Sequence, residues 1–306
     1  MSTNPAIFAS PRRPLSRETR GFLYGLLGVL IFSFSLPATR LAVRELDPII
    51  VGLGRALVAA VPALCLLILT RQQLPALRQL VRLGIVALGV VIGFPLLSAW
   101  ALQEAPASHG AIIIGLLPMA TAIISVLWER DRPAPLFWVA SFIGMVTVTG
   151  YVLVAGDSAL AASDLALLGA VLSAAVGYVE GGRLARELGS WQTICWALVI
   201  SVPFLLLPVG ASAAQHGLSA SPQAWVGFAY VSIFSMFIGF FAWYHGLSLG
   251  GIARVGQVQL LQALLTILWS GLLLGESISP LMIGAAAIVI GMIAIIRRVR
   301  IERRTG

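Results

Sequence analysis

The amino-acid sequence predicts an all-α integral membrane protein with ten transmembrane helices, arranged as two inverted five-helix repeats. Three observations support this prediction: an apolar composition, ten long apolar runs, and short motifs that recur 143 residues apart. Of the 306 residues, 59% are hydrophobic and 10% are charged, whereas a soluble domain has roughly 25% charged residues. Most of the chain is therefore expected to lie in lipid.

Each of the ten apolar runs is long enough to cross a bilayer as a helix of about 20 residues. They cover residues 21–41, 49–70, 83–103, 108–128, 135–155, 164–184, 192–209, 225–248, 253–274 and 279–297. Residues 21–155 form the first predicted repeat and 164–297 the second, between polar tails at 1–20 and 298–306. The long first run after an arginine-rich tail predicts a retained helix, since the apolar core of a cleaved signal peptide is shorter.

The distribution of arginine predicts the orientation, because basic residues are enriched in cytoplasmic loops. Seventeen of the 20 arginines lie in the two tails or in the connections after the even-numbered runs. The other side has Arg40 and Arg44, and Arg55 lies inside the second run. Both termini are therefore expected in the cytoplasm. This topology explains the net charge of +8 without a nucleic-acid partner.

The repeated motifs indicate how the two halves are related. The recurring elements are Arg40-Leu41-Ala42 with Arg183-Leu184-Ala185, Gly84 with Gly227, and Ala99-Trp100 with Ala242-Trp243. Because each repeat holds an odd number of spans, the second must enter the membrane in the opposite orientation. Inverted repeats are typical of secondary transporters, whose substrate site lies near the midplane between the halves.

The composition argues against an enzyme and against bound cofactors. The sequence has no lysine, which excludes a G-x-x-x-x-G-K phosphate loop and a Schiff-base lysine. Its three histidines are far apart and match no zinc spacing. We therefore expect no catalytic residue, no cofactor and no metal. A membrane-embedded enzyme or a channel is the less favoured class.

The sequence resembles the drug/metabolite transporter superfamily, in its ten-span EamA-domain form, over about residues 20–297. Besides the two halves, the matching features are Gly54-Arg55-Ala56, Pro118, and the segment 274–279 before the last run. The resemblance implies an exporter of small metabolites, amino acids or drugs in a bacterial inner (plasma) membrane. The branch that exports amino acids, including aromatic ones, is the most similar. Where the family often has proline in the ninth span, this chain has Ala263 and so departs from the family pattern.

Polar residues in mid-span predict a central cavity, because polar groups are costly against lipid. Gln259, Gln262 and Thr266 share one helix face and are expected to line the cavity or to bond neighbouring helices. Pro118 would bend the fourth helix and free a backbone carbonyl at the depth of Thr121, or simply kink the helix for packing.

The first, third and sixth runs supply further candidates for the site. Pro37 would act as a hinge for a gate at the outer end of the first helix, near Ser33. The alternative for Ser33 is a hydrogen bond to a carbonyl of its own helix. Ser98 is a candidate in the third run. Tyr178 lies deep in the sixth, where its hydroxyl needs a partner.

Aromatic residues are concentrated in the eighth run. Those with helical spacing are Phe237, Phe240, Phe241 and Tyr244. They predict one apolar surface suited to large apolar or aromatic substrates, with lipid-facing packing as the alternative. Trp100 and Trp243 are further candidates, although interfacial positions are favoured for both.

Three ionisable residues within apolar runs are candidates for charge recognition or coupling. Arg55 is expected to pair with Asp47 or a backbone carbonyl, and a substrate carboxylate is the alternative. Glu180 is expected to pair with Arg183 three residues on. His245 would titrate near neutral pH, but a structural role is favoured.

The expected function is export of a small zwitterionic metabolite with an apolar side chain, by alternating access. The site would be lined by spans 1, 3, 4, 6, 8 and 9, and a gradient would supply the energy. Drugs, nucleosides and other hydrophobic metabolites remain alternative substrates. The expected partners are the substrate and the lipid bilayer. A monomer is one interpretation, because glycine pairs such as Gly89/Gly93 would pack helices within or between chains.

Overall fold

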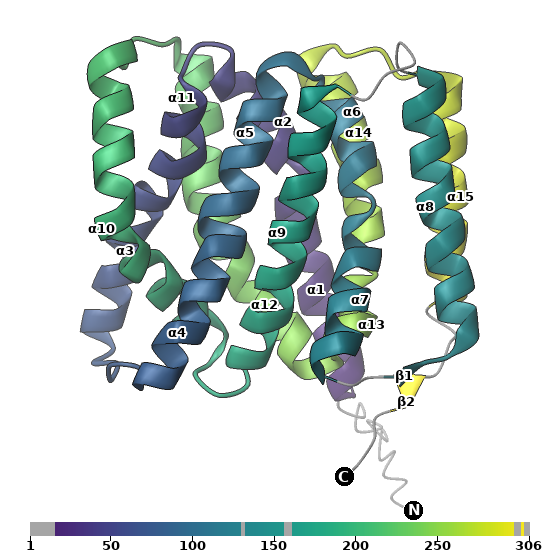
Figure 1. Cartoon of the computed structure of the whole chain (residues 1–306), viewed down its shortest axis with the longest axis horizontal. Coiled ribbons are helices and arrows are strands. Elements are labelled where there is room, and N and C mark those ends of the chain that lie inside the picture. Colours follow the sequence, from purple (N-terminus) through teal and green to yellow (C-terminus); the bar gives the residue numbers. More distant parts are fainter. Residues whose placement is uncertain (1–15, 130–131, 156–160, 297–300, 303–306) are drawn as a thin grey trace, which may run out of the picture.

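A computed structural model describes residues 16–129, 132–155, 161–296 and 301–302. Most of them are helical, and the rest form connections between helices and two paired residues on each of β1 (Arg132–Pro133) and β2 (Ile301–Glu302). This follows from the composition, because a helix pairs its own backbone groups and needs no water inside the membrane. Figure 1 shows the helices side by side, with their ends at two opposite faces.

Eight helical stretches in the described part of the chain are long and apolar enough to cross a membrane. The first four are α1 (Arg17–Ser33) with α2 (Ser35–Val43), η1 (Ile50–Gly54) with α3 (Arg55–Leu69), α4 (Leu77–Val86) with η2 (Ala87–Gly93) and α5 (Phe94–Glu104), and α6 (Ala107–Ile114) with α7 (Leu117–Glu129). The other four are α9 (Ala162–Leu184), α10 (Ser190–His216), α11 (Pro222–Ala229) with η3 (Tyr230–Ile238) and α12 (Gly239–Gly250), and α13 (Ile252–Gly256) with α14 (Gln259–Leu274). The helices α8 (Pro135–Ala155) and α15 (Pro280–Ile296) pack together at one side of the bundle (Figure 1).

Each predicted apolar run lies in one of these stretches, but some helices are longer than predicted. The third stretch begins at Leu77, before the predicted start at 83, because the Gln79 side chain caps the backbone N–H of Ala76 at 3.0 Å. The helix of the seventh predicted run, α10, continues to His216, past the predicted end at 209, with Pro208 inside the helix. A helix can therefore extend beyond its apolar run, because turns that contain polar residues or proline at its end still form backbone hydrogen bonds.

Helices of the first half pack mainly against helices of the second half. The tightest pairs are α1 with α12, α5 and η2 with α9, and α3 with α10. Glycine permits the closest approaches: a Cβ at Gly246 would lie 2.6 Å from the Gly25 nitrogen, and one at Gly89 would lie 2.8 Å from the Gly177 nitrogen. The pairs Gly89/Gly93 and Gly246/Gly250 therefore pack helices within this chain.

Three of the spans are broken near the middle of the bundle. The first breaks at Phe34, three residues before Pro37. Proline cannot donate to the Ser33 carbonyl one turn earlier, and the Thr266 hydroxyl donates to that carbonyl at 2.7 Å. In the numbering of the predicted runs, the fourth span breaks at 115–116, between α6 and α7. The ninth breaks at 257–258, between α13 and α14. The ninth span therefore breaks without a proline at Ala263.

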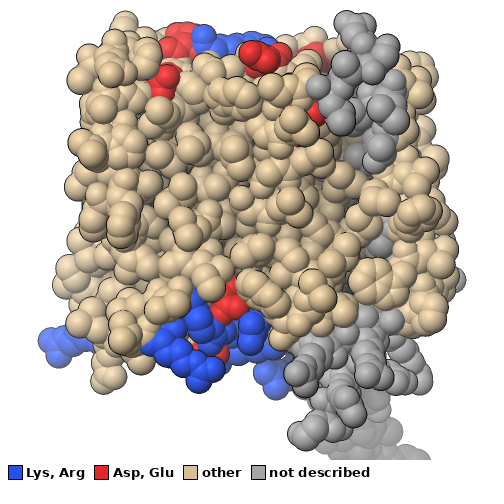
Figure 2. Space-filling model, in the orientation of Figure 1, with Lys and Arg blue, Asp and Glu red and all other residues tan. Residues whose placement is uncertain are grey.

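Apart from the buried Arg55, the charged side chains lie mainly at the two ends of the bundle. Figure 2 shows arginines gathered at the end where α4 lies in Figure 1, most acidic residues at the other end, and an uncharged band between them. The face in view thus presents apolar and neutral side chains over its middle, as a bilayer requires.

Candidate functional site

A closed cavity of about 20 Å³ lies inside the bundle, between both halves of the chain. Its lining residues are Phe32, Ser35, Arg55, Val90, Phe94, Tyr178, Ser235, Met236, Phe240 and Gln262. Such a volume holds about one water molecule, whereas ligand pockets usually measure about 300–1,000 Å³. The helices must therefore separate before a metabolite can bind here.

Arg55 is the charged residue of this cavity, and its side chain is only 1% exposed. Its Nη2 donates to the Pro95 carbonyl at 2.8 Å and its Nε to the Gly52 carbonyl at 3.3 Å. The close approach requires Gly52, where a Cβ would lie 2.8 Å from the Leu96 Cα. Of the two partners predicted for Arg55, the carbonyl is therefore the one observed.

Asp47 is engaged elsewhere, because it accepts hydrogen bonds from the Ser212 hydroxyl at 2.6 Å and from the Ile49 N–H at 2.9 Å. Among the residues that the structure describes, no carboxylate lies within ion-pair distance of Arg55. A buried cation with only carbonyl partners is costly in a membrane, which makes Arg55 a candidate functional residue.

Several buried polar atoms near the middle of the bundle have no hydrogen-bond partner within the described residues. They are both amide atoms of Gln259, Oε1 of Gln262, Nε1 of Trp243 and Oγ1 of Thr121. The Tyr178 hydroxyl is the polar group that lies close enough to the Gln259 amide to interact with it. Because unpaired buried polar groups destabilise a fold, these atoms are candidates for contact with a ligand.

Aromatic side chains form the apolar part of the site. The ring centroids of Phe32 and Phe240 are 5.1 Å apart, and those of Tyr178 and Trp243 are 5.3 Å apart. Trp243 is fully buried, so the interfacial position favoured for it is wrong. Ser35 and Ser235 form a hydrogen bond of 2.7 Å across the two halves beside these rings.

The single aromatic surface predicted on the eighth span is wrong. Phe240 lines the cavity, and Tyr244 donates to the Gly177 carbonyl at 3.1 Å. Phe237 and Phe241 instead pack against each other, with ring centroids 4.7 Å apart, and are only partly buried. The physical reason is the helix geometry itself: Phe240 and Phe241 are neighbours in α12, so their side chains project about 100° apart around the helix axis.

Other predicted residues lie outside the cavity lining. Trp100 is 46% exposed on the outer surface of α5, which corrects its assignment to the substrate site. Ser98 donates to the Pro95 carbonyl at 3.2 Å, and Ser33 donates to the Leu30 carbonyl at 2.7 Å. Ser33 thus forms the hydrogen bond to a carbonyl of its own helix that was the alternative to a role in the gate. Pro37 is buried in α2 beside the helix break.

The fourth span was predicted to line the site, but its residues pack against α13. The Pro118 carbonyl accepts a hydrogen bond from Gln257 Nε2 at 3.4 Å. Thr121 faces Gly256, where a Cβ would lie 3.5 Å from the Thr121 methyl carbon. The second span takes the fourth span's place in the cavity lining through Arg55.

Glu180 belongs to an ion-pair network at the arginine-rich end of the bundle. It pairs with Arg183 at 3.1 Å, as predicted, and also with Arg82 from α4. Arg82 makes a second ion pair with Glu187 at 2.5 Å, and its hydrogen bond lowers the pKa of Glu187 below its ordinary value. The network joins α4 to α9, so Glu180 has a structural role here.

Sequence reasoning missed the contacts that join the loops at the opposite end. Glu276 accepts hydrogen bonds from the N–H groups of Ala107 and Ser108 at 3.0 and 2.8 Å. His109 pairs with Asp164 at 2.7 Å. The sequence analysis also did not single out Ser235, although a polar residue inside the most aromatic run could have indicated it. The loop contacts left no sequence signal, because they depend on which ends meet.

These features define a polytopic helical membrane protein with a charged, polar cavity enclosed between its two halves. The chain belongs to the EamA-like transporter family, whose sequence model matches residues 19–153 and 161–297. It is therefore a membrane transporter. It is 46% identical over 285 residues to "Uncharacterized transporter YdeK" of Bacillus subtilis (strain 168), covering 93% of this chain and 99% of that protein.

A protein of known crystal structure has the same fold. It superposes with a TM-score of 0.70 at 18% sequence identity, over 92% of this chain and 99% of the other.

Proposed function

We propose that this protein is a secondary transporter that exports small zwitterionic metabolites, amino acids foremost, by alternating access around the central cavity. The observation on which the proposal rests is Arg55, a buried guanidinium in the cavity lining without a carboxylate partner among the described residues. A substrate carboxylate would supply that partner, since guanidinium and carboxylate form strong charge-assisted hydrogen bonds.

The remaining groups suit the other parts of an amino acid. The amide oxygens of Gln259 and Gln262 have no donor within the described structure and would accept hydrogen bonds from an ammonium group. The rings of Phe32, Phe240 and Trp243 offer apolar surface for a side chain. Because these groups come from both halves, opening of the halves would expose them together.

We further propose ten spans in two inverted repeats, over 21–155 and 164–297. The π-helical segments η2 and η3 begin at 87 and 230, which are 143 residues apart, the offset of the sequence motifs. The breaks at 115–116 and 257–258 also occupy related positions. The arginine distribution places both termini in the cytoplasm of a bacterial cell, with the chain in the inner membrane. We also propose a monomer as the working unit.

The driving force is a gradient of the substrate or of protons. Glu180 is already paired with two arginines, and His245 lies outside the cavity lining. Neither residue therefore resembles a proton carrier at the substrate site. The simplest mechanism is export down the substrate's own gradient, with coupling to protons as the alternative.

The test is counterflow in proteoliposomes that contain the pure protein. Vesicles are loaded with one unlabelled amino acid at a time, and uptake of labelled threonine, methionine or tryptophan is followed. Saturable uptake only in loaded vesicles is the expected result. If folded protein exchanges no amino acid but exchanges nucleosides or hydrophobic drugs, the amino-acid assignment is wrong and the aromatic lining serves those substrates.

A further inference from the structure

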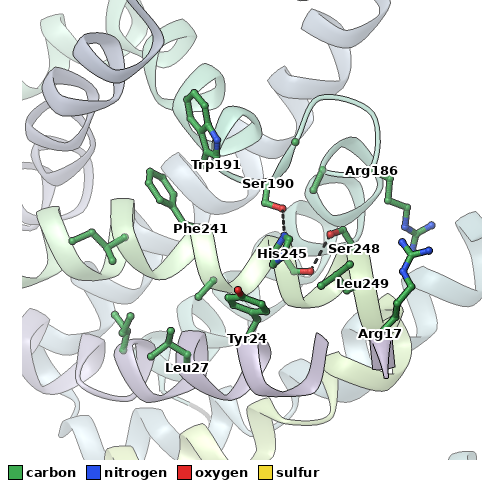
Figure 3. A pocket seen from close by; sticks show the side chains of 15 residues that line it. Arg17, Tyr24, Leu27, Arg186, Ser190, Trp191, Phe241, His245, Ser248 and Leu249 are labelled. Carbon is green, nitrogen blue, oxygen red and sulfur yellow. Dashed lines mark hydrogen bonds between the residues drawn. The ribbon is translucent and has the colours of Figure 1, made fainter. Parts of the chain in front are cut away.

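A second and larger pocket, of about 680 Å³, opens on the side of the bundle near the arginine-rich end. It lies between α1, α12 and the start of α10, and Figure 3 shows its lining side chains. None of its residues lines the central cavity. We call it the lateral groove and define it by Arg17, Tyr24, Leu27, Ile31, Ala185, Arg186, Gly189, Ser190, Trp191, Ile238, Phe241, Ala242, His245, Ser248 and Leu249.

The groove is polar at one end and apolar along the rest of its length. Arg17 and Arg186 point toward each other at its mouth (Figure 3), and both are exposed. Arg20 is close enough to His245 to act on its charge. Farther in, Leu27, Ile31 and Phe241 line the groove. The arrangement matches an amphipathic ligand with an anionic head.

The groove has the dimensions of one membrane leaflet. Arg17 and Ile31 both line it from α1, and 14 residues of helix span about 21 Å. One leaflet contributes about 15 Å of hydrocarbon and several Å of headgroup region. The arginines therefore lie at headgroup level, and the apolar end reaches toward the middle of the bilayer.

Polar groups between the mouth and the apolar end are positioned for a glycerol or ester region. His245 Nδ1 and the Ser190 hydroxyl share a hydrogen bond of 3.2 Å, and the Tyr24 ring meets the His245 ring edge-on at 4.5 Å. Trp191 lies beside them (Figure 3), in the kind of position that tryptophan takes at a membrane interface.

We propose that the lateral groove binds an anionic phospholipid of the leaflet at the arginine-rich end. Its phosphate lies between Arg17 and Arg186, and one acyl chain lies along Leu27, Ile31 and Phe241. Charge complementarity favours a lipid with net negative charge over a zwitterionic one, because arginines near the membrane surface attract anionic headgroups. The site is separate from the substrate cavity and does not depend on the identity of the substrate.

The test compares phosphatidylglycerol with phosphatidylcholine of the same acyl chains, added to the purified protein in detergent. Lipid retained per protein is counted by native mass spectrometry, and the melting temperature is measured in parallel. We expect one phosphatidylglycerol to be retained with an affinity on the order of tenfold above that of phosphatidylcholine. We also expect it to raise the melting temperature more.

Variants locate the site. The double variant Arg17→Gln/Arg186→Gln should reduce the preference to less than about threefold. The matched control Arg71→Gln/Arg78→Gln removes two arginines at the same end of the bundle but outside the groove, and it should keep the preference. Leu27→Trp, at an exposed position of the groove, should weaken retention of both lipids by filling the space for the chain.

Equal retention of both lipids by the wild-type protein would overturn the proposal, as would an unchanged preference in the double variant. One-for-one displacement of phosphatidylglycerol by a saturating transported amino acid would also overturn it, because the groove would then be a substrate site.

Discussion

At the scale of single residues, the central feature is the mismatch between burial and pairing. Arg55 has two carbonyl partners, and the Gln259 amide has none among the described residues. A carbonyl partner for Arg55 was predictable, because the sequence places one arginine inside an apolar run. The unpaired state of Gln259 was not predictable, because it depends on how closely the neighbouring helices pack.

Replacement of Arg55 separates a structural from a functional role. Arg55→Met removes the buried charge and keeps a long, unbranched side chain. We expect the free energy of unfolding to change by no more than about 1 kcal/mol, since replacing buried ionic groups by apolar ones is often neutral. Amino-acid counterflow should fall tenfold to a hundredfold, on the order of one charge-assisted hydrogen bond. Arg44→Gln, outside the cavity, is the control and should leave counterflow unchanged. A large drop in melting temperature with normal transport would mean that Arg55 only holds the helices together.

Gln259 should show the opposite effect on stability. Gln259→Leu removes two buried polar atoms without partners, so we expect a gain of about 1 kcal/mol in the free energy of unfolding. The KM for the amino acid should rise, because an acceptor for its ammonium group is lost. Thermal unfolding and counterflow measure the two quantities, and the exposed Gln223→Leu is the control for both. A loss of stability would show that the Gln259 amide is paired.

At the scale of helices, the existence of each element was predictable, whereas several of its details were not. The helices lie where the apolar runs predicted them, because a helix that crosses a bilayer needs about 20 apolar residues. The break at Phe34 follows from Pro37, but no proline in the sequence predicts the break at 257–258. The π-helical turns of η3 were also invisible in the sequence.

The packing of α1 on α12 depends on glycine. Gly246→Ala places a methyl group 2.6 Å from the Gly25 nitrogen and 2.8 Å from the Gly21 carbonyl oxygen. Backbone atoms cannot move aside as side chains do, so we expect a loss of about 1–3 kcal/mol in the free energy of unfolding. Gly210→Ala is the matched control in a helix with open space around it, and it should be neutral or stabilise by up to about 1 kcal/mol. Equal melting temperatures of the two variants would contradict this packing.

At the scale of the whole molecule, each half supplies five residues of the cavity lining. Two halves of opposite orientation, as we propose, would meet at the midplane and interleave in this way. The assignment of spans to the site was less successful. The second span reaches the cavity through Arg55, and the fourth packs on α13. Such differences arise from the three-dimensional packing of broken helices, which a sequence pattern does not specify.

The orientation of the whole chain makes its own prediction. In a Cys65→Ser/Cys195→Ser background, Gln73→Cys lies in the loop at the arginine-rich end, and Ser219→Cys lies in a loop at the other end. A membrane-impermeant maleimide added to intact cells, in which only the outer side is accessible, should label the cysteine at 219. It should label the cysteine at 73 only after the cells are opened. The reverse pattern would place both termini outside the cytoplasm.

The most direct test of the central claim uses the wild-type protein and two matched ligands. In proteoliposomes loaded with an amino acid that supports counterflow, uptake of the label is measured against competing tryptophan and against tryptamine, which lacks only the carboxylate. If Arg55 receives the substrate carboxylate, tryptophan competes at least tenfold more strongly than tryptamine, as loss of one charge-assisted hydrogen bond predicts. Equal competition by both compounds would contradict the account, because the buried guanidinium would then make no contact with the substrate.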